Sequence, residues 1–90
     1  MKIVSAAIKF QVVGSENYNI LCGKRHDAIF KFIHSLGIQF NRQTYVQGFM
    51  TDDDKFVDRR TAKIIAESAG QIIRNSAGPN SKELYSEDLW

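Results

Sequence analysis

The chain has 90 residues, of which 43% are hydrophobic and 24% charged, a length and balance typical of one folded globular domain. Twelve Lys and Arg against ten Asp and Glu give a net charge of +2. Because these charges are interspersed, they exclude the long basic stripe that follows duplex DNA, and no apolar run approaches the roughly 20 residues of a membrane span. The single cysteine cannot form an internal disulfide, which fits a reducing cytoplasm.

The first half of the chain predicts a β-hairpin followed by a helix. Residues 2–13 are rich in β-branched and aromatic side chains, and apolar and polar residues alternate from Ile8 to Val12, as in a strand. A Gly- and Asn-containing turn then leads into a second apolar run at 18–22. After Gly23 the apolar residues fall at helical spacing, and Gly37 provides the C-terminal stop.

The second half predicts two shorter strands and another helix. Residues 38–44 are polar and irregular, which favours a loop or a short edge strand. Residues 45–50 and 56–57 are predicted to be strands on either side of an acidic turn. Asp58 is a good N-cap for a helix that ends at Gly70, with small apolar residues along one face (Ala62, Ile65, Ala66 and Ala69). The fold class is therefore α+β: a short antiparallel sheet, made of the N-terminal hairpin and the central strands, packed by two helices.

The C-terminal segment predicts a docking tail on this single domain, residues 1–90. A connector containing the only proline leads into an acidic tail that ends in Leu89 and Trp90. Large apolar residues at a terminus favour burial against another surface. A domain of this size also has a thin core, so we expect a homo-oligomer.

Two predicted helix starts carry arginine, at Arg25 and at Arg59. The first N–H groups of a helix lack internal partners and lie at the positive end of its dipole, so they favour an anion. A cation there costs about 0.3–1 kcal/mol unless an anion pairs with it, and the arginine fork matches phosphate. We expect both side chains to be exposed in the free protein; a solvated surface charge is the alternative interpretation for either one. The stretch between them, with Gln47 and Phe49, has the amide and aromatic groups to hold a base or a sugar.

The sequence offers little support for catalysis or for a metal site. The acidic run Asp52–Asp54 lacks the glycine and the glutamate of a calcium loop, so a solvated turn is favoured. His26 and His34 do not have the spacing of a zinc pair. A triad of Cys22, His26 and Asp27 lacks anything to orient the imidazole, and a small buried apolar side chain is the favoured interpretation of Cys22. We therefore predict no catalytic residue, no metal and no cofactor.

Five blocks of sequence occur in an order that resembles a family of phage proteins. They are Gly23-Lys24-Arg25-His26, Gln47-Gly48-Phe49-Met50-Thr51, Phe56-Val57-Asp58-Arg59-Arg60, Ala69-Gly70-Gln71-Ile72-Ile73 and Leu84-Tyr85-Ser86-Glu87-Asp88-Leu89. The residues of these blocks and their order along the chain resemble those of the first described family of Thoeris anti-defence proteins. The acidic turn 52–55 is longer and more acidic than the serine/glycine turn of that family, which leaves the ligand preference open.

The resemblance implies a sponge in the cytoplasm of the infected bacterial host. Members of that family are not enzymes. They sequester the cyclic ADP-ribose isomers that TIR-domain proteins make as an alarm signal, some also take cyclic di- or trinucleotides, and they assemble as dimers and hexamers. The resemblance places Arg25 and Arg59 on the ligand phosphates, with His26 beside them, and gives Gln47, Phe49 and Gln71 weaker roles toward base or ribose.

Two other function classes stay open on the sequence. A nucleotide phosphodiesterase or hydrolase would need a general base near the phosphates, and His26, Asp54 and Asp58 are the candidates. A small nucleic-acid-binding or protein-binding module would use the tail that ends in Trp90. Recovery of intact ligand separates the sponge from the hydrolase.

Overall fold

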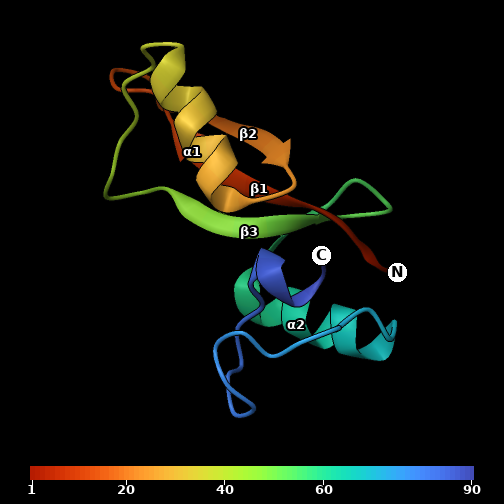
Figure 1. Cartoon of the computed structure of the whole chain (residues 1–90). Coiled ribbons are helices and arrows are strands. Elements are labelled where there is room, and N and C mark those ends of the chain that lie inside the picture. The colour runs from red at the N-terminus through yellow and green to blue at the C-terminus, as the bar shows by residue number, and fades with distance from the viewer.

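The computed structural model describes residues 1–90 as a four-stranded sheet with two helices and one short 3-10 helix (Figure 1). This confirms the predicted α+β class. In chain order the elements are β1 (Ile3–Gln11), β2 (Tyr18–Gly23), α1 (His26–Ser35), β3 (Val46–Thr51), β4 (Phe56–Asp58), α2 (Arg59–Ser68) and η1 (Ser86–Asp88).

The sheet is antiparallel throughout, with strand order β2-β1-β3-β4. The long strand β1 is central, and its Ile8 lies opposite Leu21 of β2 and Gln47 of β3. Residues 38–44 form a loop that touches the sheet through one isolated bridge, between Val12 and Phe40. Both helix stops are confirmed, because Gly37 and Gly70 have the left-handed φ values of +69° and +67° that glycine adopts without strain.

The core lies on one face of the sheet. Alternation along the strands turns the same set of side chains inward, and both helices add residues to the same cluster. Figure 1 shows α1 lying across β1 and β2, with α2 on the side of β3. α2 approaches closely because its buried hydrophobic residues are alanines. The cluster includes Ala6, Ile8, Phe10, Ile29, Ile33, Phe49, Ala62 and Ala66.

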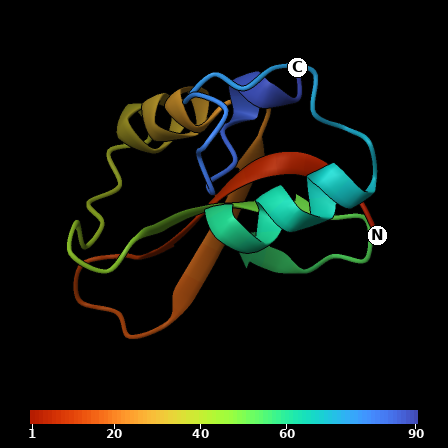
Figure 2. The same ribbon diagram turned by 90° about the horizontal axis from the view of Figure 1, so that it is seen from below.

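The C-terminal tail docks on its own chain. It returns past α2 toward the start of α1, as Figure 2 shows, and buries Leu84 and Leu89 in the core. Asp88 anchors it: this buried carboxylate accepts hydrogen bonds from Ser76 N (2.7 Å), Ser76 Oγ (2.6 Å) and Tyr85 N (2.9 Å). The tail therefore packs on its own chain, so Leu89 gives no argument for an oligomer. Homo-oligomerisation stays a prediction.

Candidate functional site

The starts of the two helices converge on strand β3 and the tail. Here the term arginine junction means Arg25, His26, Gln47, Arg59 and Tyr85. The backbone of the N-cap residue of α1, Arg25, is extended (φ −128°, ψ 142°), and its side chain does not cap the helix. At the other start, the carboxylate of Asp58 accepts a hydrogen bond from Thr61 N at 2.8 Å, as its N-cap prediction requires. Arg59 is then the first residue of α2.

Arg59, at the start of α2, contacts both β3 and the tail. Its Nη1 donates to the carbonyl oxygen of Leu84 and its Nη2 donates to Gln47 Oε1, both at 2.7 Å. The guanidinium also lies over the Tyr85 ring, 4.3 Å from the centroid, within range of a cation–π interaction. Burial lowers the pKa of Arg59, while Tyr85 and the acidic tail act in the opposite direction. The expectation of an exposed Arg59 is wrong: the side chain is partly buried and joins α2, β3 and the tail.

Arg25 has a buried group that nothing in the protein satisfies. Its Nη1 is inaccessible to solvent and has no hydrogen-bond partner. The only ion pairs of the chain are Lys31–Asp27 and Lys55–Asp53, so no carboxylate neutralises Arg25 or Arg59 at close range. A buried, unpaired donor costs about 1–3 kcal/mol. The expected full exposure of Arg25 is therefore also wrong.

His26 links the start of α1 to β3. Because the carbonyl of Gly48 can only accept, His26 Nε2 donates its proton to that oxygen, at 2.7 Å. The ring meets the Phe49 ring edge-on, with centroids 5.0 Å apart. Burial lowers the pKa of His26, the nearby charge of Arg59 lowers it further, and the Gly48 hydrogen bond and Glu87 oppose the shift. At neutral pH the imidazole is thus an uncharged donor that holds α1 against the sheet.

Two predicted ligand residues have structural contacts instead. Phe49 is completely buried in the core. The Gln71 amide pairs with one residue of β1: its Oε1 accepts from Ile3 N and its Nε2 donates to Ile3 O, both at 2.8 Å. In this conformation neither Phe49 nor Gln71 presents a free group beside the arginines. Of the predicted set, a hydrogen bond joins Arg59 to Gln47, the charge of Arg59 acts on His26, and Arg25 precedes His26 at the start of α1.

The acidic turn is held by its own hydrogen bonds. Asp52 Oδ1 accepts from Lys2 N at 3.1 Å, and Asp53 pairs with the Thr51 hydroxyl and with Lys55. Hydrogen bonding from Thr51, opposed by slight desolvation, lowers the pKa of Asp53. No group of three or more His, Cys, Asp or Glu side chains is placed to hold a metal ion. The geometry matches the solvated-turn interpretation.

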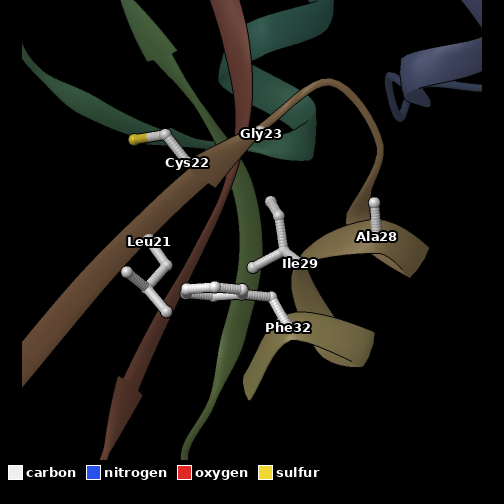
Figure 3. A pocket seen from close by; sticks show the side chains of 6 residues that line it. All are labelled: Leu21, Cys22, Gly23, Ala28, Ile29 and Phe32. Carbon is white, nitrogen blue, oxygen red and sulfur yellow. The ribbon is translucent and has the colours of Figure 1, made fainter. Parts of the chain in front are cut away.

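A small apolar pocket of about 240 Å³ lies between β2 and α1. Leu21 and Phe32 face one another across it, whereas Cys22 points away (Figure 3). Cys22 is exposed, which corrects its predicted burial, and no hydrogen bond joins it to His26, whose Nε2 is engaged by Gly48. The structure therefore does not assemble the thiol–imidazole pair that a triad would need.

Sequence reasoning missed a larger feature, a groove of about 1020 Å³ beside α1. Here the term aromatic groove means its aromatic and basic lining residues: Phe30, Lys31, His34, Phe40, Arg42 and Tyr45. Half of them come from α1 and half from the loop after it. The available signal was a pair of aromatic residues flanking Arg42: Phe40, in the segment 38–44 interpreted as a loop or short edge strand, and Tyr45, at the start of the predicted strand 45–50.

Comparison with known proteins places the chain in a phage family. A family model described as Phage T4 y16D protein matches residues 2–90, nearly the whole length, and the chain therefore belongs to this family. No match was found among the curated proteins or the solved structures. Neither helix is long and apolar enough to cross a membrane.

Proposed function

We propose that this member of the phage T4 y16D family binds a cyclic nucleotide signal of the cyclic ADP-ribose type at the arginine junction and releases it unchanged. The observation that carries the proposal is the buried Arg25 Nη1, which lacks a partner at a helix start where backbone N–H groups also favour an anion. The block resemblance to Thoeris anti-defence proteins supports the ligand class, and membership in a phage family is consistent with such a role.

The two arginines contribute differently. Arg59 already donates to two oxygens, and acidic side chains of the tail partly offset its charge. Arg25 has no ion pair. An arginine–phosphate pair at about 4 Å contributes roughly 4 kcal/mol at an effective dielectric constant of 20, before desolvation. Arg25 is therefore the principal phosphate contact, whereas Arg59 positions Gln47 through its hydrogen bond.

A sponge must outcompete the receptor of the signal, so we expect nanomolar affinity, about −12 kcal/mol. One arginine pair does not supply this alone. Further contacts from a second copy of the chain would add to it, which is why we retain the homo-oligomer, dimer or hexamer, as part of the proposal. Binding groups that do not favour a transition state over the bound ground state give no acceleration of the chemical step.

The test is calorimetric titration with cyclic ADP-ribose isomers. Arg25→Ala should weaken binding by about 30-fold or more, equivalent to about 2 kcal/mol, while leaving the free energy of unfolding unchanged or higher, because it removes an unsatisfied donor. Arg60→Ala is the matched control, since Arg60 is an exposed arginine at the other helix start. Equal affinities of Arg25→Ala and the parent protein would refute the phosphate contact.

Ligand recovery separates sequestration from catalysis. After long incubation with substoichiometric protein and heat denaturation, mass spectrometry should return all of the ligand intact. Turnover beyond one equivalent would instead establish a hydrolase, the alternative that the sequence leaves open.

A further inference from the structure

We infer that the aromatic groove is a second ligand site, which binds the base and phosphates of a free nucleotide such as a nucleoside diphosphate. It shares no residue with the arginine junction, so the inference goes beyond the proposed function and does not depend on it. The rings, the charges and the shape of the groove support this second site.

Three aromatic rings form one wall. Phe30 and Tyr45 meet edge-on with centroids 5.5 Å apart, and Phe40 and Tyr45 do the same at 5.7 Å. Phe30 and Phe40 are tilted at 30°, with centroids 6.0 Å apart. All three side chains pack against the core yet keep part of their surface exposed. Such ring surfaces bind bases by stacking, typically at about 1–3 kcal/mol per base.

The two charged side chains that line the groove, Lys31 and Arg42, are both basic. Lys31, His34 and Arg42 line the groove, and no Asp or Glu does. Arg42 is in no ion pair, and its guanidinium lies 5.3 Å from the centre of the Phe40 ring. Lys31 contacts Asp27 at 3.1 Å, but both side chains are more than three-quarters exposed, so this pair contributes little. Basic groups beside stacking surfaces favour an anion that also has a planar ring.

The groove is preformed by backbone contacts of its loop. Val13 N donates to Gln39 O and Asn41 N donates to Gln11 O, both at 2.8 Å. Thr44 Oγ1 donates to Gln11 Oε1 at 3.0 Å. A loop fixed in this way loses little conformational entropy on binding.

The volume, about 1020 Å³, is at the upper end of typical small-molecule sites. It suits one nucleotide or a dinucleotide. The overall charge is only +2, which favours a small anion over a long nucleic acid strand, whose binding depends on many phosphate contacts. We therefore assign it to a free nucleotide.

The test is calorimetric titration with ADP, compared with adenosine, which lacks phosphate, and pyrophosphate, which lacks the base. ADP should bind measurably and more tightly than either fragment.

Arg42→Glu should weaken ADP binding about tenfold or more, the loss expected for a charged hydrogen bond. Lys82→Glu, an equal charge change at an exposed position of the connector, should leave it within about twofold. Melting curves of both variants should match that of the parent, because both positions are exposed.

Five results would overturn the inference. The first three are no saturable ADP binding, pyrophosphate binding as tightly as ADP, and equal losses in Arg42→Glu and Lys82→Glu. The fourth is tighter binding of an eight-nucleotide single-stranded DNA, which would make the groove a nucleic-acid site. Loss of ADP binding in Arg25→Ala with retention in Arg42→Glu would also place ADP at the arginine junction. That last outcome would refute the groove while leaving the proposed function intact.

Discussion

The arginine junction and the aromatic groove both concentrate positive charge, but they relate to the fold in opposite ways. In the junction, Arg59 and His26 are withdrawn from solvent and hydrogen-bonded to groups of β3 and the tail. In the groove, Lys31 and Arg42 remain in water above rings that are already packed. Substitutions at the junction should therefore change stability and binding together, with Arg25 as the exception, whereas substitutions of groove cations should change binding alone.

The largest expected effect is at the strand beneath the junction. A Cβ added at Gly48 would lie 2.2 Å from the backbone oxygen of Val57, and that backbone belongs to β4, so relief requires the strands to separate. Gly48→Ala should lower the free energy of unfolding by more than about 3 kcal/mol. Denaturant unfolding measures it, with Val46→Ala on an exposed position of the same strand as the control. A loss below about 1 kcal/mol would show that β4 is not tightly paired.

Arg59→Ala should have the next largest effect, about 2–3 kcal/mol, because it leaves Gln47 and the Leu84 carbonyl without their charged donor. The sequence predicted an exposed Arg59, which would give a much smaller loss. Urea denaturation should show Arg60→Ala within about 0.5 kcal/mol of the parent. If Arg59→Ala were equally neutral, the guanidinium would not hold the tail.

The pH dependence of stability should show a smaller effect, which is specific to His26. The pKa of His26 is lowered in the folded protein, so the unfolded chain binds a proton first as the pH falls below about 6.5. Stability should therefore decline as pH falls from about 6.5 to the lowered folded pKa. As the pH falls, this loss of stability occurs before the loss that comes from protonation of Asp53, Asp58 and Asp88. The folded pKa values of these three carboxylates lie below the usual range.

Melting temperatures between pH 7 and pH 5 measure the effect. His26→Gln should flatten the profile in this window, and His34→Gln, at an exposed position of the same helix, should retain it. An unchanged slope in His26→Gln would contradict the buried, neutral imidazole.

The smallest expected effect is in the groove. Arg42→Ala and Lys31→Ala should each change the free energy of unfolding by less than about 0.5 kcal/mol, because exposed cations without buried partners contribute little. Thermal melts of the two variants measure this. A loss of 2 kcal/mol or more, about the cost expected at Arg59, would remove the distinction between the two regions.

Local signals predicted most of the fold. The alternation in β1, the helical spacing after Gly23, the Asp58 cap and the two glycine stops all depend on neighbours in sequence, and the structure confirms each. The pairing of Gln71 with Ile3 joins residues 68 positions apart. No local pattern encodes such a contact, so a structural amide was interpreted as a ligand group.

The candidate site was predictable only in part. The placement of Arg25 and Arg59 at helix starts followed from caps and periodicity. The partial burial of Arg59 did not, because it depends on the tail returning to bring Leu84 and Tyr85 against its side chain. The inward direction of Phe49 follows from its register opposite Ala6, but that register is known only once the strands are paired. The groove was missed because its loop lacks a periodic pattern.

The most direct test of the account is a nuclear magnetic resonance titration of isotope-labelled protein with cyclic ADP-ribose. We predict saturable shifts of the backbone amides of residues 25–27 and 59–61 and of the Arg25 side chain, with the ligand spectrum unchanged afterwards. The same shifts should be absent in Arg25→Ala and present in Arg60→Ala. Saturable shifts confined to the loop 38–45, or identical shifts in Arg25→Ala and the parent, would contradict the claim that the arginine junction is the signal-binding site.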